Sequence, residues 1–461
     1  MAYKPTIGLE IHIELNTKSK MFCSCLNNPD ERKPNINICP VCTAQPGTLP
    51  VINEEAVRKV IKTGLSLNCQ IPEFSKFDRK NYFYPDLPKG YQISQYDKPL
   101  CENGFLEIGS PIFKKIRITR VHLEEDTARL IHEKDTSLVD FNRAGIPLME
   151  LVTEPDINSA KEAKQFAEEL HLIMHYLDVS DADMEKGEMR VEVNISLSKD
   201  SKLGTKVEIK NLNSFRSVER GIDYEIERQT KVLESKGKVI QETRGWLDVK
   251  GITVSQREKE EAYDYRYFPE PDLPPLHFTR EEVERIRVGI PELPQLRQER
   301  FIKEYQLDRD SAVTLVYNKE LGDRFEKSAV TLPKDLFKTA SDFLINTEAK
   351  NYDIPPAHFN QLMVLIKDGK ISNIAAKEIL TEIIEQDPSA VIEKRGLGQV
   401  SDVKELKKIA EEIVKNNQKV VGDLKAGKAN ALQFLIGQTM AKTKGRANPE
   451  LVRDILQKLL G

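Results

Sequence analysis

A carboxylate and an imidazole lie two positions apart near the N-terminus, where they could share a metal ion. Residues 6–14 read TIGLEIHIE, with an apolar residue at every second position, which predicts a half-buried β-strand. Glu10 and His12 fall on its polar face, roughly 6.5–7 Å apart, so one cation could reach both. A solvated polar face explains such an isolated pair equally well, so the metal hypothesis requires ligands from elsewhere in the chain.

A run of three acids could supply one such ligand. Residues 116–120 predict a strand, and the alternation of apolar residues changes between Ile118 and Val121, which indicates a β-bulge. The bulge could aim Glu124 or Glu125 into a site, and the sequence does not choose between them. Residues 124–126 are also typical of a solvated turn.

Glu150 is a further candidate because it is the one carboxylate in an apolar strand. Its immediate neighbours are Met and Leu, and burying an unpaired carboxylate is costly. A metal ion shared with Glu10 and His12 would compensate its charge. An ion pair with Arg143 is the alternative.

Four cysteines form a second metal-ligand pattern, Cys-x-Cys and Cys-x-x-Cys separated by thirteen residues. They are Cys23, Cys25, Cys39 and Cys42. Four thiolates complete a tetrahedral zinc site with no open coordination position, which favours structural zinc; the alternative is a set of unligated thiols. Cys69 and Cys101 stand alone and are expected to be buried small residues or free thiols.

Polar strand faces and an aromatic segment suggest a nucleotide site. Residues 189–197 and 206–210 predict a hairpin with Arg, Glu, Asn and Lys on one face, and fixed cations beside carboxylates suit a phosphate with Mg²⁺. Basic residues among the aromatic residues of 77–86 suit nucleotide or tRNA-end recognition. The candidates for ATP or substrate binding are Arg79, Lys80, Tyr82, Tyr84, Arg190, Asn194, Ser196, Lys206, Glu208, Lys210 and Asn213. Cross-strand pairing on an exposed face is the alternative, and no P-loop motif is present.

The composition fits a globular protein of several domains. The 461 residues carry a net charge of −4, which gives no global basic signature for nucleic acid. Residues 401–461 nevertheless hold twelve Lys/Arg against seven Asp/Glu, an excess of five positive charges. No apolar run approaches the ~20 residues that span a bilayer. The first strand leaves no room for a signal peptide, so we expect a cytoplasmic protein.

The patterns along the chain predict an α+β fold. Residues 1–290 mix alternating segments with helical ones and should form an antiparallel sheet with helices over 54–67 and 159–177. Residues 291–398 are helical in pattern. Residues 399–461 should form a small helical tail domain with helices near 403–413, 431–440 and 449–460.

Several long motifs resemble one family. They are IGLEIHIEL, FDRKNYFYPD, HLEED, DFNRAGIPLME, KVEIKNLNSF and DYRYFPEPD, with a tail segment around 425–449. Together they cover essentially the whole chain and resemble the B subunits of the tRNA-dependent glutamyl/aspartyl amidotransferases.

The resemblance implies a glutamine-synthetase-like cradle domain that uses ATP and Mg²⁺. It would phosphorylate the side-chain carboxylate of glutamate mischarged on glutamine tRNA, or of aspartate mischarged on asparagine tRNA. Ammonia from an amidase (A) subunit would then displace phosphate, and a small C subunit would complete a heterotrimer.

The resemblance also implies roles for single residues. The expected Mg²⁺ ligands are Glu10, His12, Glu124, Glu125 and Glu150, and the expected catalytic residues are Glu10, His12, Glu125 and Glu150. The zinc knuckles at 23–42 occur in only some members. The expected phosphate contacts to tRNA in the tail are Lys425, Lys428, Lys442, Lys444 and Arg446.

Two other functions compete with this one. A zinc-stabilised tRNA-binding scaffold without catalysis would need the cysteines and the basic tail, but not Glu10, His12 or Glu150. A ligase acting on free amino acids would leave the helical C-terminal part without a purpose.

Overall fold

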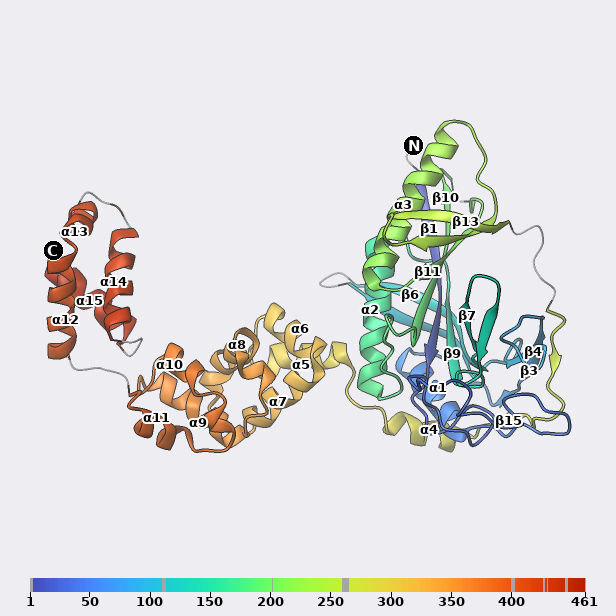
Figure 1. The fold of residues 1–461 in the computed structure, drawn as a ribbon, viewed down its shortest axis with the longest axis horizontal. Helices are drawn as coiled ribbons and strands as arrows, with labels where there is room; N and C mark the ends of the chain where they lie inside the picture. The colour runs from blue at the N-terminus through green and yellow to red at the C-terminus, as the bar shows by residue number, and fades with distance from the viewer. Residues whose placement is uncertain are drawn as a thin grey trace. The chain divides into compact units, whose positions relative to one another are not determined.

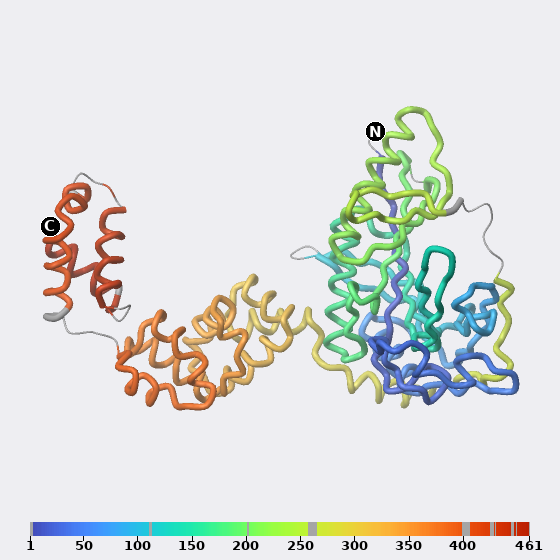
Figure 2. Tube along the Cα trace, in the orientation of Figure 1, coloured from blue at the N-terminus to red at the C-terminus, as the bar shows by residue number. Residues whose placement is uncertain are grey.

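The chain divides into two compact units, Met1–Leu293 and Pro294–Gly461. The computed structural model describes residues 3–109, 113–200, 202–258, 265–398, 403–425, 428, 430–443 and 447–460 (Figure 1, Figure 2). The division falls close to the expected boundary at 290/291. The expected separation of a tail domain at 398/399 stays a prediction.

A large sheet forms the centre of the first unit. Among the described residues it has eight strands in the order β13-β12-β11-β10-β1-β9-β6-β5. Their bounds are β1 Lys4–Glu14, β5 Cys101–Ile108, β6 Lys114–Glu125, β9 Pro147–Thr153, β10 Met189–Ser198, β11 Val207–Leu212, β12 Glu242–Leu247 and β13 Ile252–Glu258. The predicted strand at 6–14 is therefore an interior strand, paired with β10 and β9.

The sequence had suggested an antiparallel sheet, but the observed sheet is mixed. β11 and β12 pair in parallel, whereas the other neighbouring pairs are antiparallel. The helix α3 (Phe215–Glu234) joins these two strands. A crossover helix returns the chain from the end of β11 to the end of the sheet at which β11 began, which makes the next strand parallel.

Three helices cover the apolar face of the sheet. They are α1 (Glu54–Ser66), α2 (Ala160–Leu177) and α3, and α2 runs alongside α3 (Figure 1). Asn53, Ser159 and Ser214 cap their N-termini by accepting hydrogen bonds from backbone N–H groups. The apolar residues of β1 are buried against this layer, so the polar face of β1 points away from it.

Shorter elements surround the sheet and close the first unit. They are β2 Phe74–Ser75, β3 Asp78–Asn81, β4 Tyr91–Ser94, β7 Arg129–His132, β8 Ser137–Asp140, β14 Phe268–Pro269, β15 Leu276–His277 and the helix α4 Arg280–Val288. β4 packs beside β6, and β14 pairs with β3. The segment after residue 264 therefore returns to the region of the predicted aromatic motif.

The described residues of the second unit are helical. The α-helices are α5 Pro294–Glu304, α6 Arg309–Tyr317, α7 Lys319–Ala329, α8 Phe337–Asn346, α9 Pro356–Lys367, α10 Asn373–Glu378, α11 Pro388–Arg395, α12 Val403–Asn416, α13 Gln418–Lys425, α14 Asn430–Lys442 and α15 Pro449–Leu460. The short 3₁₀ helices are η1 Lys334–Leu336, η2 Glu348–Asn351 and η3 Glu382–Ile384. α12 to α15 share an apolar cluster that includes Leu406, Leu435 and Leu456. None of the helices in the described part of the chain combines the length and the apolar character needed to cross a membrane.

Candidate functional site

Glu150 lies between two histidines in one row across the sheet. On β9 it pairs in register with His12 of β1 on one side and with His122 of β6 on the other. His12 Nε2 and His122 Nε2 each lie 3.4 Å from Glu150 Oε2. Residues directly opposite each other on neighbouring strands point to the same face, so the strand register alone brings the three side chains together.

Glu10 and Glu124 complete this carboxylate–histidine cluster. His12 Nε2 lies 3.9 Å from a carboxylate oxygen of each. The ligand atoms of Glu10, His12 and Glu150 lie within 4.8 Å of one another, and so do those of His122, Glu124 and Glu150. Glu124 Oε2 and His122 Nδ1 are buried without a hydrogen-bond partner in the described part of the chain. Such atoms fit a site that binds a cation.

His122 was not among the metal ligands expected from the sequence, although the sequence contained a signal for it. After the bulge, the polar face of β6 carries Arg120, His122 and Glu124, alternating with the buried residues Val121 and Leu123. Continuing the period of two through this segment would have selected the histidine. The predicted bulge itself is confirmed, because the register of β6 with β9 shifts between Ile118 and Arg120.

Glu125 lies outside the cluster, so its expected roles as a metal ligand and as a catalytic residue stay predictions that this geometry does not support. Adjacent residues on a strand point to opposite faces, so Glu125 faces away from Glu124. Its carboxylate lies 2.6 Å from Lys89 Nζ and accepts a hydrogen bond of 2.9 Å from the backbone N–H of Ile93. The predicted alternative for Glu150 does not occur either, because Arg143 lies 3.5 Å from Asp126.

The charges of the cluster are strongly coupled. Burial lowers the pKa of His12, but the hydrogen bond and charge of Glu150 and the charges of Glu124 and Glu10 outweigh it and raise that pKa to about 9. Burial raises the pKa of Glu150, yet His122 and His12 hold it well below its ordinary value. Anionic carboxylates around imidazoles make the pocket attractive to a divalent cation, which would displace the imidazole protons.

The cluster forms part of the wall of an open cleft of about 780 Å³. Basic and aromatic side chains line much of the rest, together with the carboxylates of Asp126, Glu192 and Glu208: Lys80, Arg120, Arg190, Lys206, Lys210, Tyr82, Tyr265 and Tyr267. Carboxylates hold two of these cations in place, since Arg190 lies 2.8 Å from Asp126 and Lys210 lies 2.8 Å from Glu192. The cleft therefore offers positive charge next to a cation site, an arrangement suited to polyphosphate.

The predicted nucleotide-binding residues separate into two groups. Those that line the cleft are Lys80, Tyr82, Arg190, Lys206, Glu208 and Lys210. Those that do not are Arg79, Tyr84, Asn194, Ser196 and Asn213. Arg79 instead forms a bidentate pair with the buried carboxylate of Glu270, at 2.7 and 2.8 Å, and stacks on Tyr91. It fixes the segment that carries β14 against β3, a structural role that strand alternation does not reveal.

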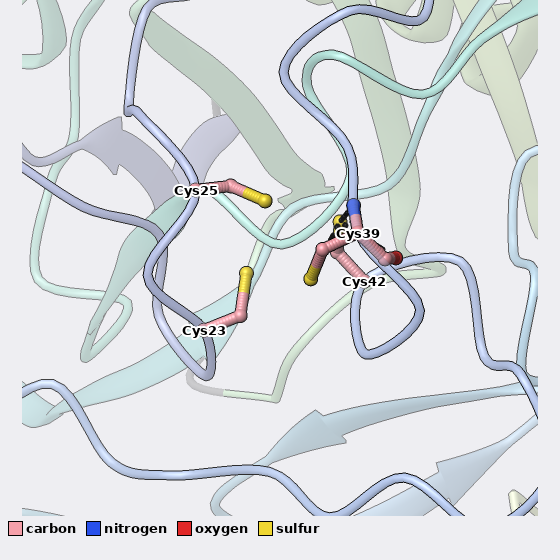
Figure 3. A group of neighbouring side chains, drawn as sticks. All are labelled: Cys23, Cys25, Cys39 and Cys42. Carbon is pink, nitrogen blue, oxygen red and sulfur yellow. Dashed lines mark hydrogen bonds between the residues drawn. The ribbon is translucent and has the colours of Figure 1, made fainter.

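The four predicted cysteines converge at a second site (Figure 3). Their sulfur atoms lie within 4.8 Å of one another, and Cys39 Sγ is 3.9 Å from Cys42 Sγ. Sulfur atoms at the corners of a zinc tetrahedron are about 3.8 Å apart, so the residues fit zinc. The hydrogen bond between Cys23 and Cys42 lowers the pKa of Cys42 to about 5 and raises that of Cys23, and burial raises the pKa of Cys25. The thiolate is the form that binds metal.

The predicted tRNA contacts are only partly described. Lys428 and Lys442 are exposed and lie beside Asp423 and Glu412. Lys444 and Arg446 lie outside the described residues, as does the side chain of Lys425 at the end of α13.

Comparison with known proteins agrees with this arrangement. Residues 5–284 match the family model described as the GatB/GatE catalytic domain, and residues 338–460 match the one described as the GatB domain. Relatives named as the B subunit of aspartyl/glutamyl-tRNA(Asn/Gln) amidotransferase are 49% identical in Thermotoga maritima and 48% identical in Persephonella marina. These alignments cover 100% of this chain and 99% and 100% of the relatives, respectively. The chain therefore belongs to the family of aspartyl/glutamyl-tRNA(Asn/Gln) amidotransferase B subunits.

Proposed function

We propose that this chain activates the side-chain carboxylate of a glutamate or aspartate mischarged on tRNA(Gln) or tRNA(Asn), using ATP. The carboxylate–histidine cluster in a cation-lined cleft carries the proposal. Family membership supports tRNA-dependent amidation as the overall reaction, and the cleft suggests which half of that reaction occurs here.

The chemistry requires an activated carboxylate. A carboxylate is a poor electrophile because its leaving group would be oxide. A carboxylate oxygen attacks the γ-phosphorus of ATP, the bond to the bridging oxygen breaks, and ADP leaves. Ammonia then attacks the acyl carbon with its lone pair, inorganic phosphate leaves, and the nitrogen loses a proton to give the amide.

The residues of the cluster fit one or two divalent cations. Glu10, His12, Glu150, His122 and Glu124 would hold them. Carboxylates are the ligands that Mg²⁺ takes in nucleotide sites. When bound, Mg²⁺ neutralises charge on the phosphoryl oxygens.

The chain's own cations would position ATP and the aminoacyl group. Arg120, Arg190 and Lys210 line the cleft beside the cluster. Burial lowers the pKa of Lys80, but the charge of Glu124 and its neighbours raises it above the ordinary lysine value. Such fixed donors stabilise the charge that spreads over the phosphoryl oxygens in the transition state.

The relatives are named as B subunits, which supports an assembly with other subunits. The cysteine cluster would hold a structural zinc ion. An amidase subunit and a small C subunit would supply ammonia and join the chain into a heterotrimer in the cytoplasm. Lys425, Lys428, Lys442, Lys444 and Arg446 would contact tRNA phosphates.

The test is amidation of mischarged tRNA by the reconstituted complex with the variant Glu150→Gln. We expect amidation and tRNA-stimulated ATP hydrolysis to fall at least ~100-fold, since the variant removes a ligand shared by both halves of the cluster. Hydroxylamine should trap an acyl hydroxamate with the unmodified complex in the absence of glutamine. Glu227→Gln, an exposed position on α3, is the matched control. Full amidation by Glu150→Gln would disprove the proposal.

The non-catalytic scaffold remains the competing function. It predicts that Glu150→Gln leaves both ATP hydrolysis and tRNA binding unchanged. Unchanged tRNA binding together with lost ATP hydrolysis supports the catalytic role.

A further inference from the structure

Lys20 is a fully buried lysine beside the cysteine cluster. Its side chain is 0% exposed. Its Nζ lies 3.8 Å from Cys42 Sγ and donates a hydrogen bond of 3.2 Å to the carbonyl oxygen of Phe141. Within the described residues, no carboxylate forms an ion pair with this amine. Of its two polar contacts there, the one that can carry negative charge is therefore a thiol.

A buried ammonium group without a counter-charge is strongly disfavoured. The carbonyl oxygen of Phe141 offers only a dipole, so the counter-charge of the amine has to come from the sulfur of Cys42. A divalent ion held by four thiolates leaves two negative charges in excess. A lysine against one of the sulfur atoms balances part of that excess and gains a counter-charge for itself.

The same amine links the cluster to the turn that precedes β9. Phe141 begins this turn, and Asn142 accepts hydrogen bonds from the backbone N–H groups of Ile36 and Asn37, in the loop between the two cysteine pairs. On the other side, the backbone N–H of Met21 donates to the carbonyl oxygen of Gly145. The turn is thus held by residues next to both cysteine pairs.

Gly145 lies against both the lysine stem and the cysteine. It has a φ of +81°, and a Cβ atom at this position would lie 3.5 Å from Cys42 Cβ, 3.7 Å from Lys20 Cδ and 4.0 Å from Glu125 Oε2; this carboxylate is paired with Lys89 Nζ at 2.6 Å. The lysine stem, the cysteine and the turn are therefore in mutual contact. β9 starts two residues later and carries Glu150.

We infer that Lys20 is the internal counter-ion of the metal-loaded cysteine cluster and that, through Phe141, it ties this cluster to the turn leading into β9. The inference rests on the proposed zinc site. It assigns Lys20 a positioning and charge-balancing role, and no part in the chemistry of the cleft.

The first experiment measures zinc affinity of the full chain by competition with a chromophoric chelator. Lys20→Met keeps the length of the side chain and removes its charge. We expect zinc affinity to fall by about 10–100-fold, the usual loss when a partner of the ligands is removed. Lys20→Arg keeps the charge and should lose less.

Lys62→Met is the matched control. The amine of Lys62 also donates to a backbone carbonyl, that of Leu177 at 2.6 Å, but contacts no thiol among the described residues. Its loss should leave zinc affinity unchanged. If the unmodified chain binds no zinc, the proposed zinc site is wrong. If it binds zinc and Lys20→Met binds equally well, only the role of Lys20 is wrong.

A second measurement separates charge balance from packing. Removal of zinc by a chelator removes the excess charge that the four metal-bound thiolates hold beside Lys20. Lys20→Met should therefore lower the Tm more in zinc-loaded protein than in chelated protein, whereas a loss of packing alone would lower it equally in both. An equal loss of Tm in both states would overturn the inference.

Discussion

The carboxylate–histidine cluster and the cysteine cluster are positioned by different parts of the backbone. The first draws its side chains from β1, β6 and β9, whose backbones are joined by ladder hydrogen bonds. The second is built on loops around residues 23–42, outside the regular strands and helices. A sheet fixes the direction of its side chains before any ion binds, whereas loops depend more on the ion they enclose. The comparison suggests that removal of metal affects chemistry at the first site and local structure at the second.

The largest expected effect of this difference is structural. Cys25→Ser removes a thiolate, so zinc should be lost and the loops at 23–42 should lose protection in hydrogen exchange by several kcal/mol. The affinity of the cleft for Mn²⁺ should change less than about threefold, because β1, β6 and β9 remain paired. Loss of protection across β1 and β9 as well would show that the two sites are not independent.

A smaller effect should distinguish the two adjacent acids of β6. We expect Glu124→Gln to weaken Mn²⁺ binding by about 10–100-fold, because its carboxylate lies in the cluster. Glu125→Gln, the neighbouring substitution, should leave Mn²⁺ affinity nearly unchanged, since its carboxylate faces Lys89. Electron paramagnetic resonance of Mn²⁺ measures both. Equal losses would contradict the observed register.

His122 offers a sharper test of the row across the sheet. His122→Asn should lower Mn²⁺ affinity by about tenfold, whereas loss of His132, which lies in the β7–β8 hairpin, should have no effect. Imidazole ligands suit Mn²⁺ at least as well as Mg²⁺, so competition between the two ions should favour Mn²⁺. Unchanged binding by His122→Asn would limit the site to the ligands around His12.

The last expected effect is the pH dependence of metal binding. The pKa of His12 is raised to about 9, so its imidazole is protonated at neutral pH in the metal-free protein. A metal ion must displace this proton. Apparent Mn²⁺ affinity should therefore rise with pH, by up to about tenfold per unit, and flatten as pH passes the pKa. His12→Gln should flatten the titration, and an unchanged slope in that variant would assign the proton to another group.

The alternation of apolar and polar residues made part of the site predictable from the sequence. The strand at 6–14, the bulge near Ile118 and the lone carboxylate Glu150 were predicted because a period of two needs only local information. The choice between Glu124 and Glu125 was left open, although continuing the period of two from Val121 and Leu123 would have placed Glu124 beside His122 on the polar face.

Partners far apart in the sequence account for the other differences. Arg79 contacts Glu270, which lies 191 positions away, so nothing near Arg79 indicates its structural role. The parallel pairing of β11 and β12 depends on the path of α3 across the sheet. Neither relation leaves a periodic pattern in the chain.

The bulge in β6 determines which of its side chains face the apolar layer and which face the cleft. If β6 were regular with its present sequence, Arg120, His122 and Glu124 would share a face with Ile118, inside the apolar layer, and Glu125 would enter the cleft. The extra residue at Thr119 prevents this exchange. Deleting Thr119 would give a regular strand with the following residues on their present faces. Inserting one residue beside it would also keep their faces, but would move them along β9, so that His122 no longer lies opposite Glu150. Chain length at this point therefore constrains the cluster in a way that substitution data alone would not detect.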